Sequence, residues 1–267
     1  MTFDRIEKKI IRPPAAHNVA RLLDPDSELK TTENIARFAL SIPAFNYIGA
    51  LKICYDKVAL GINLETAVSA IRKTGAPSGR EQNEKLVRAF FEHDDRRRYS
   101  DLPVLDSYRG QFMISREIAV PTAPAFTIYE RGKQVPVVMC GWKNFGLRRE
   151  QIRAWLSMLQ SGLFSYVDYR QSPWEVLLLP EVIDGEVPIR SARVIRPGEY
   201  NLLSEPDLRE LAAMYARAQK AAMPIARELW DAREAKRRQR ERGQPDQPQM
   251  PAPDGPPDLF AKDSDKE

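Results

Sequence analysis

The feature that most constrains the fold is a block of short apolar runs between residues 112 and 180. Three strand-like runs come first, the amphipathic segment RREQIRAWLSMLQSGL follows, and the runs FSYVD and WEVLLLP close the block. The first three runs are FMISREIAV, AFTIYE and VPVVMCGW, and the turn RGKQ between the last two predicts a hairpin. The block therefore predicts an α+β fold whose mixed-sheet core spans 108–200 and carries one packed helix.

Two patterns inside the block fix its buried faces. The amphipathic segment repeats apolar residues at helical spacing, which predicts one core-facing stripe made of Ile152, Trp155, Leu156, Leu159 and Leu163. The run VPVVMCGW is nearly continuous in apolar residues, as a central strand covered on both faces would be.

The residues before the core predict helices. Residues 1–30, with Pro13 and Pro14, are interpreted as an N-terminal arm. Apolar residues at helical spacing then predict a helical region over 31–100. In it, Asn63 is expected to cap the helix that begins with the next residue.

The residues after the core predict C-terminal helices over 204–242. Ser204 is expected to start them, and Pro224 is expected to divide them into two. From Gly243 onward the composition is dominated by Pro, Gln, Asp and Gly, so we predict a disordered acidic tail over 243–267.

Composition indicates a soluble, cytoplasmic protein. The 267 residues are 43% apolar and 29% charged, which is ordinary for a globular chain. The start is charged within four residues and does not resemble a signal peptide. The longest uncharged stretch, 38–51, is too short to cross a bilayer, so no membrane association is expected. Cys54 and Cys140 lie far apart and are expected to be buried free thiols.

The motifs of several enzyme classes are missing. The sequence has no GxxxxGK[ST] phosphate loop, no GxGxxG turn and no GxSxG elbow. Its two histidines, His17 and His93, leave little room for a catalytic triad. We therefore expect no cofactor and no metal site, apart from the magnesium of the alternative described below.

The element order expected over 81–168 resembles that of the PD-(D/E)xK nuclease-like superfamily. In that family an acid after Pro begins the second strand and (D/E)-x-Lys ends the third, and these residues hold Mg²⁺ and the attacking water. Here the matching segments are Pro124-Ala125-Phe126 and Gly141-Trp142-Lys143. Lys143 fits the pattern, whereas Ala125 and Gly141 stand where the acids belong. The resemblance therefore implies a degenerate core without metal-dependent cleavage.

Other acids leave an enzymatic alternative open. Glu117, Glu130 and Asp168 are the nearest substitutes for the missing carboxylates. A divergent nuclease would combine Glu117 and Asp168 with Lys143 and would need Mg²⁺.

Positive charge suggests a DNA contact. The chain carries a net charge of +4, with six basic and two acidic residues in 233–242. Basic side chains can meet phosphates by charge alone. The candidates for such contacts are Lys143, Arg148, Arg149, Arg153, Arg237, Arg238 and Arg240.

The tail contains a candidate docking peptide. Asp258, Leu259 and Phe260 resemble the C-terminal half of the short motif by which bacterial proteins bind the sliding clamp. The glutamine expected two residues before Asp258 is Pro256. The resemblance implies a protein partner, with a sliding clamp as one identity for it.

Together these patterns favour a non-catalytic interaction protein with a degenerate nuclease-like core, with DNA transactions as one setting. A divergent metal-dependent nuclease and a structural subunit of a larger assembly are the alternatives.

Overall fold

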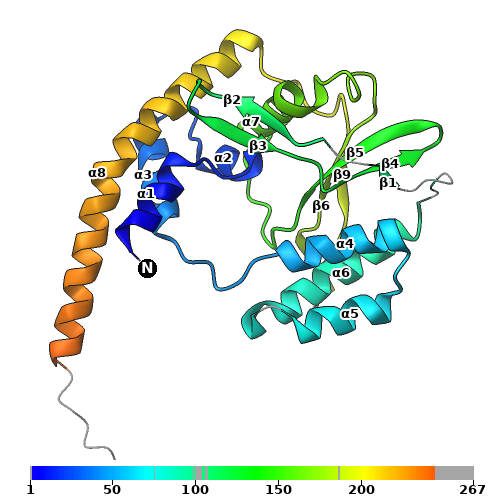
Figure 1. Ribbon diagram of the computed structural model, residues 1–267, viewed down its shortest axis with the longest axis horizontal. Coiled ribbons are helices and arrows are strands. Elements are labelled where there is room, and N and C mark those ends of the chain that lie inside the picture. Colours follow the sequence, from blue (N-terminus) through cyan, green and yellow to red (C-terminus); the bar gives the residue numbers. More distant parts are fainter. Residues whose placement is uncertain are drawn as a thin grey trace, which may run out of the picture. The chain divides into compact units, whose positions relative to one another are not determined.

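The computed structural model describes residues 2–74, 76–97, 99, 104–105, 108–185 and 187–243. The described chain divides into two units, one that ends at Arg227 and one that begins at Glu228. The first combines helices with a mixed sheet, so the α+β prediction is confirmed (Figure 1). Its helices are α1 (Phe3–Ile11), α2 (Ala16–Leu22), α3 (Glu28–Leu40), α4 (Ile48–Leu60), α5 (Leu64–Lys73), the 3₁₀ turn η1 (Pro77–Gly79), α6 (Arg80–Asp94), α7 (Arg149–Leu159), the π-helical turn η2 (Gln160–Phe164) and the start of α8 (Glu205–Gly243).

A five-stranded sheet forms the centre of the first unit, in the order β1 (Val104–Leu105), β4 (Phe126–Glu130), β5 (Lys133–Cys140), β6 (Glu175–Leu178) and β9 (Arg193–Ile195). Arg131 and Gly132 make the β4–β5 turn with φ of 52° and 75°, the left-handed geometry that suits two-residue hairpins. The strands β5 and β6 run parallel, and α7 connects them. The predicted hairpin, packed helix and central strand are therefore present.

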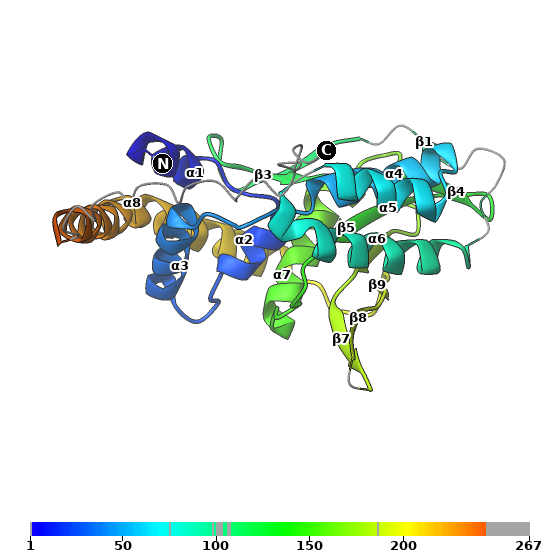
Figure 2. The ribbon, with the colours of Figure 1, turned by 90° about the horizontal axis from the view of Figure 1, so that it is seen from below.

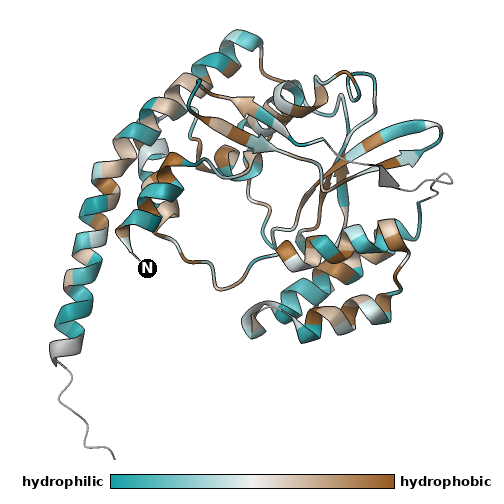
Figure 3. Ribbon diagram, in the orientation of Figure 1, coloured by the Kyte–Doolittle hydropathy of each residue, from teal (hydrophilic) through white to brown (hydrophobic). Residues whose placement is uncertain are grey.

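Both faces of this sheet are covered. Alternate residues of β4, β5 and β6 pack against α4, α5 and α6 in one cluster that includes Ile128, Val137 and Leu177. The other set of side chains lies on the opposite face, where Thr127 meets the hydroxyl of Tyr169 at 2.9 Å in the segment after η2. Figure 3 shows β5 and β6 as mainly apolar, as strands buried on both faces require.

The predicted arm over 1–30 is wrong, because it contains α1 and α2. Phe3, Ile6 and Ile10 follow a helical spacing and are buried. The side chain of Gln219 in α8 donates hydrogen bonds to the carbonyls of Ile10 and Ile11. The end of α1 is thus held by a residue about two hundred positions away, and the end of α2 is held by Gln151 of α7, which donates to the carbonyls of Arg21 and Leu23.

The run FMISREIAV is a hairpin, whereas the sequence predicted one strand. The strands β2 (Gly110–Met113) and β3 (Ala119–Thr122) pair with each other in a separate two-stranded sheet. The hydroxyl of Ser115 accepts hydrogen bonds from the backbone N–H groups of Glu117 and Ile118. This serine turn reverses the chain where alternation predicted extension.

The run FSYVD is not a strand. It enters η2 and a series of turns over 165–172. Phe164 stacks on Trp174 with ring centroids 4.8 Å apart, and Tyr169 is fully buried. A Cβ at Gly162 would stand within 3 Å of the Gln111 and Phe112 backbone, so glycine permits η2 to contact β2. The order expected over 81–168 is one helix, three strands, a second helix and a final strand. In the described chain that final strand is absent before residue 168, and the next strand is β6, which begins at Glu175.

The expected break at Pro224 is also absent, since α8 continues as one helix. Proline removes one helical hydrogen bond. In the first unit Tyr215, Ala218, Ala222 and Ala226 form a buried stripe on α8. This packing keeps the residues on both sides of Pro224 helical.

The predicted cap of α5 is present, since the Asn63 side chain accepts a hydrogen bond from the Thr66 N–H.

His17, which lies in an aromatic cluster, should make the free energy of unfolding depend on pH. The His17 ring lies edge-on to Trp142 and Trp155, and burial lowers its pKa to about 4 from 6.5. In the unfolded chain His17 binds a proton near pH 6.5, whereas in the folded chain it does so only near pH 4. The contribution of neutral His17 to the free energy of unfolding is therefore fully present above pH 6.5 and is lost as the pH falls toward 4. We expect His17→Gln, which cannot be protonated, to remove about 2 kcal/mol of the loss between pH 7 and pH 5. Urea denaturation of both proteins at the two pH values measures this, and equal pH dependence would contradict it.

Candidate functional site

The residues proposed for a divergent nuclease do not form one site. Asp168 lies near the start of β5, where it lines a shallow surface pocket with Lys133 and Gln134. Lys143 follows the opposite end of this eight-residue strand. At about 3.3 Å per residue the two are roughly 25 Å apart. Glu117 is exposed in the β2–β3 turn.

The positions without acids contribute to packing. A Cβ on Gly141 would stand 2.5 Å from Cδ1 of the buried Leu86, so a carboxylate there would displace the core. The Ala125 N–H donates to the Val137 carbonyl at 2.7 Å and extends the β4–β5 pairing. Among the described residues, no group of three His, Cys, Asp or Glu side chains could hold a metal ion.

Several predicted phosphate contacts already have protein partners. Arg148 lies 3.5 Å from the Asp24 carboxylate, and Arg153 donates to the Asn201 carbonyl at 2.7 Å. Arg149 is exposed. In the second unit Arg237 pairs with Glu234 at 3.1 Å, and two more of the predicted residues, Arg238 and Arg240, are exposed there. DNA binding by this set stays a prediction.

The remaining predicted phosphate contact, Lys143, lies at the base of a separate hairpin. Its ammonium lies 3.0 Å from Oε1 of Glu181, the first residue of β7 (Glu181–Asp184). Its carbonyl accepts a hydrogen bond from the Glu181 N–H at 2.8 Å. Lys143 therefore holds the base of the hairpin that β7 makes with β8 (Val187–Arg190).

The β7–β8 hairpin is the candidate functional site. It is a separate two-stranded sheet that pairs with no other strand of the described chain, and Figure 2 shows it extending away from the main sheet. Gly185 takes φ of 62° in the turn. A lone hairpin of this kind is only marginally stable in water, so its persistence depends on its base and on whatever covers it.

Apolar residues occupy both faces of this hairpin. The register pairs Val182 with Ile189 on one face and Ile183 with Pro188 on the other. Ile183 is 81% exposed, Val187 is 61% exposed, and Val182 and Ile189 are each 40% exposed. Exposed apolar residues scattered singly are normal, but a contiguous group on a projecting element marks an interaction surface.

Arg190 fixes this hairpin to the core although it is only 5% exposed. One terminal nitrogen donates to the carbonyls of Gly141 and Leu179, and the other donates to the Tyr47 hydroxyl and the Gln82 side chain. No acid within the described part of the chain forms an ion pair with it. The guanidinium fork thus joins β8 to the ends of β5 and β6 and to α6 through hydrogen bonds to neutral groups.

The segment VIDGEV contains a turn signal, but nothing in its sequence indicates an interaction site. The Asp184-Gly185 pair is a recognised turn signal. Val182-Ile183 before this turn and Val187-Pro188-Ile189 after it place apolar residues on both faces of the strands. Strands of this kind are usually buried. Exposure of this strand follows from tertiary structure, and no local pattern reveals it.

None of the helices in the described ranges combines the length and apolar composition needed to span a bilayer. Asp258, Leu259 and Phe260, with the rest of 244–267, lie outside the described residues.

Comparison with known proteins gives no family assignment. The sequence matches no protein-family model, no curated protein and no solved structure.

Proposed function

We propose that this chain is a non-catalytic interaction protein that binds a protein partner through the β7–β8 hairpin. The observation that carries the proposal is the exposure of Val182, Ile183, Val187 and Ile189 on both faces of one projecting hairpin. Burying four such side chains would contribute several kcal/mol to association.

The chemistry of the hairpin defines the kind of partner it fits. Both faces are apolar, so a matching partner has an apolar cleft that closes around the hairpin. The hairpin edges also carry backbone N–H and C=O groups that a partner strand can pair with. A protein surface supplies both features, whereas nucleic acid offers phosphates to a hairpin that carries no basic residue between Glu181 and Ile189.

The enzymatic alternative is supported less well, because its residues Lys143 and Asp168 lie at opposite ends of β5. A structural subunit of an assembly is compatible with the hairpin proposal, since a subunit would use the same surface. The degenerate nuclease-like core remains part of the proposal as a scaffold.

The test is the size of the native complex. We expect the wild-type chain, expressed at native level, to elute from gel filtration of cell lysate in a complex larger than two copies of the 30.5 kDa chain. The variant Ile183→Asp/Val187→Asp should elute without the partner, at the size of one or two copies of the chain, because two buried charges are incompatible with an apolar cleft. Met113→Asp, which places one charge on another exposed apolar residue, is the control. An unchanged complex with the hairpin variant would refute the proposal.

A further inference from the structure

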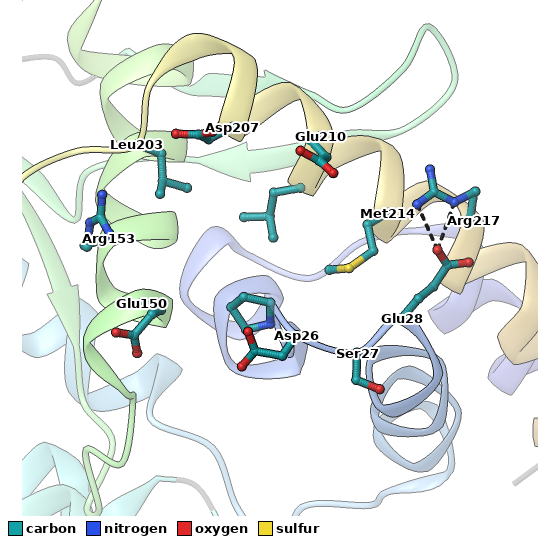
Figure 4. A pocket seen from close by; sticks show the side chains of 12 residues that line it. Asp26, Ser27, Glu28, Glu150, Arg153, Leu203, Asp207, Glu210, Met214 and Arg217 are labelled. Carbon is teal, nitrogen blue, oxygen red and sulfur yellow. Dashed lines mark hydrogen bonds and ion pairs between the residues drawn. The ribbon is translucent and has the colours of Figure 1, made fainter.

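A pocket with acidic walls lies in the first unit, beside the first turns of α8. Its volume is about 440 Å³, and the apolar side chains of its floor include Leu203, Leu211 and Met214. Figure 4 labels Leu203 and Met214 among the lining residues. Segments from the α2–α3 connection, α7 and α8 contribute the walls. This volume fits one or two large side chains of a docking segment.

The walls carry an excess of negative charge. Five carboxylates line the pocket, against the two guanidinium groups of Arg153 and Arg217. Arg217 is already paired with Glu28, at 2.8 Å. Asp26, Glu150 and Glu210 have no side-chain hydrogen bond or ion pair to any described residue. Three unpaired carboxylates from three elements around one apolar floor favour a cationic occupant with an aliphatic stem.

The same sequence contains a segment with the complementary charge. Residues 233–242 carry six basic and two acidic side chains and lie in the helical part of the second unit. Arg238 and Arg240 are exposed. An arginine suits this pocket because its stem can cover apolar surface while its guanidinium binds carboxylates through two parallel hydrogen bonds.

We propose that the acidic pocket of one copy binds the basic segment 233–242 of a second copy. In a two-fold dimer this contact occurs twice, since each copy supplies one pocket and one segment. The charges of Arg238 and Arg240 would then face Glu150 and Glu210 instead of DNA phosphates. This proposal is independent of the β7–β8 hairpin and concerns a different surface.

The test uses the full-length chain and light scattering after gel filtration. We expect a dimer at low salt that dissociates as the salt concentration rises, because the contact is largely electrostatic. The variants Glu150→Lys/Glu210→Lys and Arg238→Glu/Arg240→Glu should each weaken dimerisation at least ~10-fold. All four positions are exposed, so the folded state should tolerate the substitutions. Glu117→Lys/Asp168→Lys makes the same charge change at exposed sites outside the pocket and should leave the dimer intact.

Mixing the two monomeric variants gives the decisive result. A pocket bearing lysines then meets a segment bearing glutamates, and the natural pocket of the other variant meets the natural segment, so a heterodimer should form. A wild-type chain that stays monomeric at low salt overturns the proposal, as does a mixture that fails to dimerise. It is also overturned if Arg238→Glu/Arg240→Glu abolishes DNA binding without changing the oligomeric state.

Discussion

Replacing Arg97 with alanine is expected to lower the free energy of unfolding by about 3–5 kcal/mol. Its guanidinium donates to the Glu175 carboxylate at 2.7 Å and to the Glu130 carboxylate at 2.9 Å. These acids end β4 and begin β6, the two strands on either side of β5. Glu175 is 7% exposed, and its other partner, Arg196, lies 3.3 Å away at the surface. Without Arg97 the Glu175 carboxylate stays buried, and the surface residue Arg196 alone compensates its negative charge too weakly.

The neighbouring residue provides a matched control. Arg96 pairs with Glu92 one helical turn away, and both side chains are exposed. Arg96→Ala should cost only about 0.5 kcal/mol, because exposed ion pairs contribute little. Chemical denaturation of both variants at pH 7 and constant salt gives the comparison. A cost below about 1 kcal/mol for Arg97→Ala would contradict the role assigned to this ion network.

The second large effect is expected for Arg190→Ala, which should detach the β7–β8 hairpin from the core. The carbonyls of Gly141 and Leu179 would lose their donor, at about 1–3 kcal/mol for each buried group left unsatisfied. We therefore expect hydrogen exchange of the Val182 and Ile189 amides to accelerate by at least ~100-fold, while amides of β5 change less. Arg190→Lys should rescue poorly, because an ammonium cannot reproduce the fork.

Arg193→Ala separates the anchoring role from a general loss of positive charge. This arginine lies three residues further on and donates to the Tyr200 hydroxyl at the surface. Its replacement should leave hairpin exchange unchanged within about twofold. Equal protection of the hairpin in wild type and Arg190→Ala would show that β7 and β8 do not depend on this anchor.

Local pattern predicted the elements whose packing is decided nearby. The α7 stripe, the β4–β5 turn and the Asn63 cap each follow from a few adjacent residues, and all three are present. The helices α1 and α2 could not be recognised as part of the fold, because their partners are distant in sequence: Gln219 of α8 binds the end of α1, and Gln151 of α7 binds the end of α2. The expected break at Pro224 does not occur for a related reason, since tertiary packing outweighs one lost hydrogen bond.

The candidate site was even less accessible from sequence. Lys143 can be proposed from its motif, but its ion pair with Glu181 cannot. That contact depends on the parallel pairing of β5 and β6, which brings the ends of the two strands together. The separation of Lys143 from Asp168 likewise depends on strand direction, which spacing does not define. The apolar residues of β7 and β8 look like core residues until the fold shows that nothing described covers them.

Direct contact between the hairpin and a partner is the central claim, and site-specific photo-crosslinking tests it most directly. A photoreactive amino acid placed at Ile183 of the full-length chain, in cells that express it at native level, should yield one discrete crosslinked protein. The same group at Arg116, in the exposed β2–β3 turn, should yield none. Identical crosslinking at both positions, or no crosslink from Ile183, would contradict the assignment of the β7–β8 hairpin as the interaction surface.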